Sequence, residues 1–170
     1  MRRHVRTLAM ALMLAAVAAS TSIYDFTLKT ANGEDYPLSN YDHTPVILVV
    51  NVASECGFTD VNYRALQVHT LQHVHVVCMK ILSSLFILLG THSCTKVDVN
   101  GPTAHPLYTW LKSNVDDGRD IAWNFEKFFV VDGQPWKRIA HNVNLNSLED
   151  EILYALAHET SYHDDDHDEL

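Results

Sequence analysis

The chain has 170 residues, of which 47% are apolar and 19% are charged, and its formal net charge is −9. This composition fits one folded domain with a hydrophobic core and excludes a chain that is disordered throughout. The acidic balance argues against a general nucleic-acid binder or a protein that attaches to anionic membranes, because both need basic patches.

The N-terminus has the layout of a secretory signal peptide. The basic start MRRHVR precedes the apolar run TLAMALMLAAVAA, and Ala18 and Ser20 fit the small-residue positions before a cleavage site. A membrane anchor is the alternative, but the apolar run is too short to span a bilayer comfortably. We therefore expect residues 1–20 to be cleaved and expect no stable membrane insertion.

The C-terminus carries a second targeting signal. Residues 159–170 form an acidic tail that ends in HDEL, a receptor-read signal for retention in the endoplasmic reticulum. The aspartates at positions 164–166 are expected to present this signal in solvent. Together the two signals predict a protein of the endoplasmic-reticulum lumen whose folded domain occupies residues 21–158.

The first elements of this domain are predicted to be strands and a helix. The pair Asn32-Gly33 lies between two strand-like runs and is a strong hairpin signal. Residues 46–52, VILVVNV, are nearly all apolar, which is typical of a central strand buried on both faces. Residues 59–72 follow with apolar positions on one helical face.

In the middle of the domain, the sequence predicts one further strand and one further helix. Residues 74–79 have the pattern of a second buried strand, whereas residues 81–89 are apolar and fit either a strand or a helix. Residues 105–113 suit a short helix with Pro106 in its first turn.

The last part of the domain predicts a second hairpin and a closing helix. Asp132-Gly133 separates two strand-like runs. Residues 147–157 are amphipathic, and Ser147 with Asp150 resembles a capping box at the start of that helix. The order of strands and helices along the chain predicts a compact α/β sandwich with helices on the faces of a sheet.

Cys56 is the residue best placed for covalent chemistry. It follows the apolar strand and comes just before the helix that begins near Thr59. The free N–H groups at a helix N-terminus lower the pKa of a thiol, Gly57 lets backbone amides approach, and Glu55 would oppose a thiolate if it pointed at the sulfur. From spacing alone, a reactive thiol and a structural buried cysteine both remain open.

The stretch NVASECGFTDVNYRALQ, residues 51–67, resembles the active-site segment of glutathione peroxidases. It is most similar to their endoplasmic-reticulum branch, which has cysteine where many relatives have selenocysteine. Four further stretches agree in the same order along the chain: residues 23–41, 96–112, 123–133 and 147–152. The resemblance implies a thioredoxin-like α/β fold, with a central sheet flanked by helices and an N-terminal β-hairpin. It also implies thiol-dependent reduction of hydrogen peroxide or organic hydroperoxides in the response to oxidative stress.

Carried over by motif, the resemblance implies three catalytic residues. Cys56 would attack the peroxide O–O bond and become a sulfenic acid. Trp123 and Asn124 would donate hydrogen bonds to the thiolate and to the departing oxygen. No cofactor is implied. The oxidised cysteine would be reduced by glutathione or by a protein dithiol such as protein disulfide isomerase.

The resemblance breaks between residues 73 and 95. This interval is shorter than in the family and lacks the Phe-Pro-Cys-Asn-Gln-Phe motif, whose glutamine belongs to the family's active-site tetrad. Either the chain is a shortened isoform or its gene model is in error, and the abrupt loss and return of resemblance favours the error. Cys78 is interpreted as a buried strand residue, Cys94 is given no resolving role, and a Cys78–Cys94 disulfide stays open.

The remaining polar clusters predict no other chemistry. His69, His73 and His75 lack a further ligand at a recognisable spacing, so no metal site is expected. Arg138 could line the rim of the active site or face solvent, and we expect it to face solvent. Two functions therefore remain: a luminal thiol peroxidase, and a catalytically impaired thioredoxin-like redox partner or binding module in the same compartment.

Overall fold

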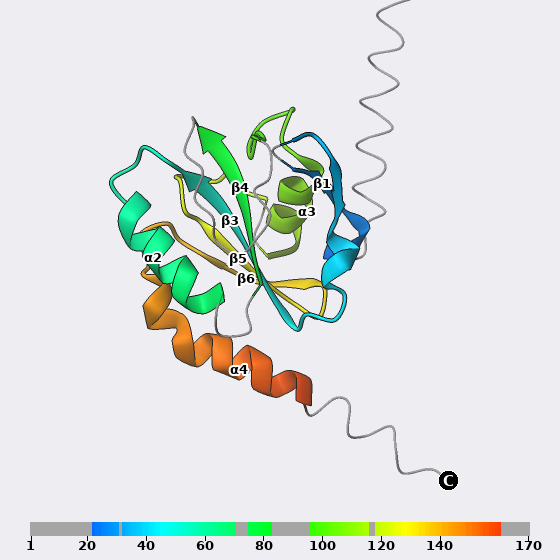
Figure 1. Ribbon diagram of the computed structural model, residues 1–170, viewed down its shortest axis with the longest axis vertical. Helices are drawn as coiled ribbons and strands as arrows, with labels where there is room; N and C mark the ends of the chain where they lie inside the picture. Colours follow the sequence, from blue (N-terminus) through cyan, green and yellow to red (C-terminus); the bar gives the residue numbers. More distant parts are fainter. Residues whose placement is uncertain (1–21, 31, 71–74, 83–95, 116–117, 161–170) are drawn as a thin grey trace, which may run out of the picture.

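A computed structural model describes residues 22–30, 32–70, 75–82, 96–115 and 118–160 (Figure 1). Its strands are β1 (Thr27–Lys29), β2 (Asp35–Pro37), β3 (Val46–Ala53), β4 (His75–Leu82), β5 (Lys127–Val131) and β6 (Gln134–Ile139). Its α-helices are α2 (Thr59–Thr70), α3 (Pro106–Val115) and α4 (Glu149–Thr160), and its short 3-10 helices are η1 (Ile23–Asp25), η2 (Leu38–Tyr41) and η3 (Leu145–Leu148).

The central sheet has four strands in the order β4-β3-β5-β6. Strand β3 runs parallel to β4 and antiparallel to β5, and β5 and β6 form an antiparallel hairpin. Every residue of β3 is buried, as expected for a strand with neighbours on both edges and covered faces. The predicted order of strands and helices is therefore confirmed.

The core consists of two layers, one on each face of the sheet (Figure 1). Alternate residues of β3 point to opposite faces, so Ile47 and Val49 pack toward α3 and the β1–β2 hairpin, on the opposite face from Leu48 and Val50. Helices α2 and α4 cover the second face, to which Leu66 and Ile152 contribute. Cys56 packs at the edge of this second layer.

Both predicted hairpins form at their glycine turns. In the β5–β6 turn, Asp132 and Gly133 both have positive φ, 48° and 75°, as a tight two-residue turn requires. The turn also holds the start of the fold, because the Ile23 amide donates to the Gly133 carbonyl oxygen at 2.9 Å. A side chain at position 133 would collide with Ser22 Oγ and the Tyr24 ring.

The start of the closing helix differs from the prediction. Asn144, in an extended conformation, accepts a hydrogen bond on its side chain from the Asn146 amide at 3.0 Å, which caps η3. Ser147 Oγ instead donates to the Asn144 carbonyl oxygen at 2.7 Å. The predicted capping box of Ser147 and Asp150 was therefore wrong, because a 3-10 turn precedes α4 and Asn144 begins that turn.

Strand β4 confirms the strand predicted at residues 74–79, and it continues to Leu82. The rest of the ambiguous run at 81–89 and Cys94 lie outside the described residues, as does the side chain of Cys78. Among the helices that the structure describes, none is both long and apolar enough to cross a membrane.

Candidate active site

Cys56 lies in the turn between the end of β3 and the start of α2. Thr59 fixes this turn: its Oγ1 accepts from the Cys56 amide at 3.1 Å and donates to the Ala53 carbonyl oxygen at 3.1 Å. The Thr59 amide also donates to the Cys56 carbonyl oxygen at 2.9 Å. The half-buried thiol of Cys56 thus sits at a helix N-terminus, as the sequence predicts.

The surroundings of Cys56 are open on one side. Among the described residues, no atom beyond the two chain neighbours lies within 4 Å of the point where a Cβ on Gly57 would be, and Glu55 is exposed. Phe58 is 37% exposed and meets His141 edge-on, with ring centroids 5.8 Å apart. This side of the turn is therefore accessible and partly apolar.

The segment with Trp123 and Asn124 meets the same edge of the sheet. Because β3 and β5 are antiparallel, the end of β3 lies beside the start of β5. The Phe125 amide donates to the Asn51 carbonyl oxygen at 2.7 Å, and Asn51 Nδ2 donates to the Trp123 carbonyl oxygen at 2.9 Å. The structure therefore brings the backbone of this segment next to the strand that leads to Cys56.

The two motif residues differ in exposure, and the residue after them is strained. Trp123 is 56% exposed and Asn124 is half-buried, whereas Phe125 is fully buried. Phe125 has a φ of 68°, a left-handed conformation that costs a residue with a side chain about 1–2 kcal/mol. Its ring packs edge-on against Tyr63 of α2, with centroids 5.9 Å apart, so tertiary contacts hold the turn into β5.

Arg138 does not face solvent, and the prediction for it was wrong. Its Nε and Nη2 donate to Glu126 Oε2 at 2.8 and 2.6 Å, and both side chains are only 5% exposed. The antiparallel register of the β5–β6 hairpin places Arg138 opposite Phe128, two positions from Glu126. A register shift between Phe129 and Val130 produces this pairing, so the position of the turn in the sequence does not by itself predict the buried pair.

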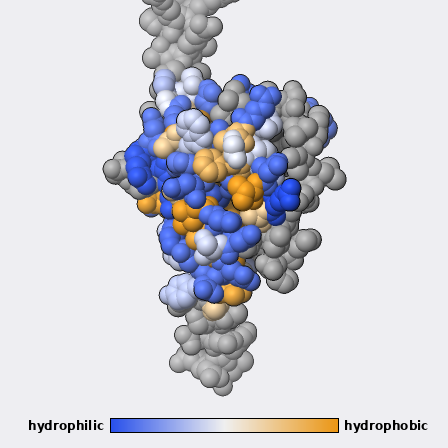
Figure 2. All heavy atoms as spheres, turned by 90° about the vertical axis from the view of Figure 1, so that its left-hand side faces the viewer, coloured by the Kyte–Doolittle hydropathy of each residue, from blue (hydrophilic) through white to orange (hydrophobic). Residues whose placement is uncertain are grey.

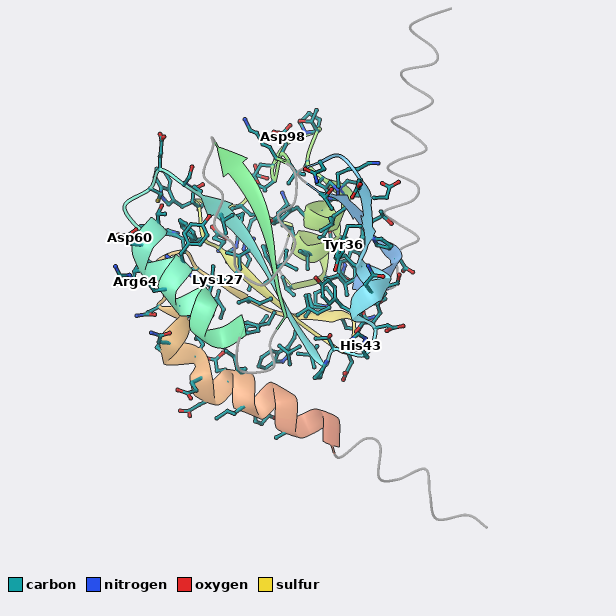
Figure 3. The ribbon with its side chains drawn as sticks, viewed as in Figure 1. Tyr36, His43, Asp60, Arg64, Asp98 and Lys127 are labelled. Atoms are coloured by element: carbon teal, nitrogen blue, oxygen red, sulfur yellow. The ribbon has the colours of Figure 1, made fainter. Side chains whose placement is uncertain are left out.

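Lys127 is a second buried charge that the sequence did not predict. It lies on β5, in the central sheet. Asp60 and Arg64, by contrast, lie on the outer side of α2, the helix that covers one face of this sheet (Figure 3). The Lys127 side chain is fully buried, and Nζ donates to the Val143 carbonyl oxygen at 3.0 Å. Burial lowers the pKa of Lys127 to about 8, against the opposing effect of the Glu126 carboxylate.

Among the described residues, no three His, Cys, Asp or Glu side chains are grouped so that they could hold a metal ion. His73 lies outside the described residues, so the histidine cluster considered from the sequence is not described as a whole. What the described residues do present is a half-buried thiol at a helix N-terminus and a loop with an indole and an amide at the same edge.

Comparisons with known proteins agree on one family. The family model described as glutathione peroxidase matches residues 23–84. The chain is 38% identical over 161 residues to probable glutathione peroxidase 5 of Arabidopsis thaliana, covering 81% of this chain and 92% of that protein. It is 36% identical over 138 residues to the chloroplastic phospholipid hydroperoxide glutathione peroxidase 1 of the same plant, and it spans 58% of that relative's length.

Solved structures give the same result. The structure is similar to the apo form of Trgpx, with a TM-score of 0.69 and 31% identity, covering 81% of this chain and 97% of that one. It is equally similar to GPX1 of T. cruzi, with a TM-score of 0.69 and 28% identity over 81% of this chain and 97% of that one. The chain therefore belongs to the glutathione peroxidase family, with a thioredoxin-like fold and the thiol peroxidase function of an oxidoreductase.

Proposed function

We propose that Cys56 is the peroxidatic thiol and that Trp123 and Asn124 are its catalytic partners. The observation that carries this proposal is the pair of hydrogen bonds from Asn51 and Phe125, which joins the Trp123 segment to the strand leading to Cys56. The resemblance of the motif is the source of these roles, and the hydrogen bonds between the Trp123 segment and β3 support them.

The reaction follows from the chemistry of the thiolate. The sulfur of Cys56 attacks one peroxide oxygen, the O–O bond breaks, and the sulfur is oxidised to a sulfenic acid. The other oxygen leaves with the bonding electrons and takes a proton to become water or an alcohol. Donors placed where this charge develops lower the barrier, and the Trp123 indole N–H and the Asn124 amide are such donors.

The substrate class that fits is hydrogen peroxide together with apolar organic hydroperoxides. Several relatives are named phospholipid hydroperoxide glutathione peroxidases. On this chain, large apolar side chains at the start of α2 and in the Trp123 segment are exposed: Phe58 by 37%, Val61 by 47% and Trp123 by 56%. Figure 2 shows the left-hand side of the molecule in Figure 1, where apolar side chains lie among polar ones.

We infer that this chain has fewer hydrogen-bond donors at the thiol than its family. The interval 73–95 lacks the motif with the tetrad glutamine, although the family model match extends into this interval, to residue 84. We attribute the departure to an error in the gene model, and we expect this exact chain to react more slowly than a form with the segment restored. A catalytically impaired redox partner is the alternative that a complete loss of rate would support.

The proposed compartment is the endoplasmic-reticulum lumen. The signal-peptide layout of residues 1–20 and the HDEL terminus support it, while named relatives include mitochondrial and chloroplastic proteins. There glutathione or a dithiol such as that of protein disulfide isomerase would attack the sulfenic sulfur, form a mixed disulfide and release water. Secretion of a chain lacking residues 167–170 would support this location, and unchanged retention would contradict it.

The test is a time course of sulfenic-acid formation at Cys56. Residues 21–170 carrying Cys78→Ser and Cys94→Ser are mixed with slight excess hydrogen peroxide and a sulfenic-acid trap, and the intact mass is followed over seconds. Trapping at Cys56 much faster than at a free thiol supports the proposal. Labelling at the rate of a free thiol, or equal labelling of a further Cys56→Ser variant, contradicts it.

A further inference from the structure

The loop that carries Trp123 and Asn124 is held by a buried ion pair between Glu126, just after these two residues, and Arg138 of β6. Glu126 uses its two carboxylate oxygens for different tasks. Oε2 accepts from Arg138, while Oε1 accepts from the Ala122 amide at 2.7 Å and from the Trp123 amide at 3.3 Å. The side chain is 5% exposed, so these contacts take place out of water.

Arg138 completes the same clamp from β6. Its Nη1 donates to the Arg119 carbonyl oxygen and its Nη2 to the Asp120 carbonyl oxygen, each at 3.0 Å. The planar guanidinium therefore bridges the carboxylate and the backbone of the loop, a geometry that lysine cannot reproduce. The Cζ atom of Arg138 lies over the Phe128 ring, 5.3 Å from the ring centroid, which orients the guanidinium.

We propose that the Glu126–Arg138 ion pair is a positioning device that sets where Trp123 and Asn124 stand relative to Cys56. The inference rests on the proposed function of those three residues. The pair itself is not catalytic, because it is almost wholly buried and because Phe128, on which Arg138 lies, belongs to the core layer on the opposite face from Cys56.

Two other contacts would keep the rest of the loop anchored if the ion pair were lost. The Asn100 side chain accepts from the Ile121 amide and donates to its carbonyl oxygen, both at 2.8 Å. Asn51 holds the Trp123 carbonyl oxygen from β3. The backbone amides of Ala122 and Trp123 are the groups that depend on Glu126.

The test compares Glu126→Gln and Arg138→Lys with a matched control. Glu126→Gln keeps the side-chain shape and one acceptor but removes the charge. Arg138→Lys keeps the charge but loses the planar guanidinium that bridges the carboxylate and the loop backbone. Lys137→Gln is the control, because Lys137 precedes Arg138 on β6 and forms a separate ion pair with Glu151 at 2.5 Å. All three keep the hydrophobic core unchanged, and a cooperative urea transition verifies the fold of each.

Two readouts are measured for each variant. The first is the Trp123 indole N–H resonance in a nitrogen–proton correlation spectrum, assigned with Trp123→Phe. The second is the rate of sulfenic-acid formation at Cys56. We expect both Glu126 and Arg138 variants to shift or broaden the Trp123 resonance and to slow the reaction by about 10–100-fold, since small misplacements of catalytic groups cost up to that much. Lys137→Gln should change neither.

A double-mutant comparison separates positioning from a general loss of stability. If the pair acts through the loop donors, Glu126→Gln should have little further effect on the rate in a chain that already carries Trp123→Phe and Asn124→Ala. A full additional loss in that background overturns the proposal. So does an unchanged Trp123 resonance in both pair variants. If wild-type Cys56 reacts no faster than a free thiol, the proposed function fails, while the Trp123 resonance still decides the positioning role.

Discussion

The side-chain amide of Asn51 donates to the carbonyl oxygen of Trp123 at 2.9 Å, across 72 positions of the chain. Asn51 is fully buried at the end of β3, five residues before Cys56. The Asn51 side chain thus connects the strand that leads to Cys56 with the loop that carries Trp123 and Asn124.

Replacing Asn51 with alanine should destabilise the fold and slow the reaction together. The Trp123 carbonyl oxygen loses its donor and a buried side chain is truncated, so we expect a loss of about 1–3 kcal/mol in the free energy of unfolding. Urea unfolding and the rate of Cys56 oxidation measure the two effects. Asn146→Ala, at an exposed position, is the control and should leave both unchanged. Equal behaviour of the two variants would refute the role given to Asn51.

Thr59→Val should loosen the turn around Cys56 while keeping the shape of the side chain. The hydroxyl that accepts from the Cys56 amide and donates to the Ala53 carbonyl oxygen is lost, and Thr59→Ser retains it. We expect the valine variant to lose about 1–2 kcal/mol, the usual range for a lost helix-start contact, and to react more slowly. The serine variant should restore most of the rate. A valine variant as fast as the wild type would show that this contact does not position the thiol.

Because of Lys127, we expect the free energy of unfolding to rise with pH. Burial lowers its pKa from 10.5 to about 8 in the folded chain, so between these values the unfolded chain holds a proton that the folded chain has lost. Where the unfolded state binds more protons, the free energy of unfolding increases with pH. Lys127→Met should therefore remove a rise that the wild type shows from pH 8 to pH 10, measured as the difference between their urea midpoints. Lys29→Met, at a side chain that is 55% exposed, should leave that rise in place.

The sequence predicts elements well where the pattern is local. The apolar run of β3 and the glycine turns at Gly33 and Gly133 carry their own signals, and the structure confirms the strand and both hairpins. The buried pair of Glu126 and Arg138 was not predicted, because its partners are brought together only by the hairpin register and by the course of a loop.

The positions and contacts of charged and polar side chains were the other source of error. In KFFVV the lysine begins a strand whose other residues are apolar, and nothing local shows that Lys127 is buried and bound to the Val143 carbonyl oxygen. Ser147 likewise has the spacing of a helix cap. The structure instead caps the preceding 3-10 turn with Asn144, whose side-chain oxygen accepts a hydrogen bond from the Asn146 amide. For the catalytic assignment, motif resemblance supplied the roles of Cys56, Trp123 and Asn124, which the proposed experiments test.

Gly133→Ala should be far more damaging than Gly33→Ala, although both glycines have positive φ, 75° and 83°. The backbone conformation alone costs an alanine about 1–2 kcal/mol at either position. At Gly33 a methyl group would meet no atom of the described residues within 4 Å apart from its chain neighbours. At Gly133 it would collide with Ser22 Oγ and the Tyr24 ring, which dock the N-terminal segment on the β5–β6 turn. Urea midpoints of the two variants measure the difference, and Gly133→Ala should also expose the buried Ile23 to proteolysis of the N-terminal segment. Equal midpoints for both variants would mean that this docking contributes nothing to stability beyond the turn itself.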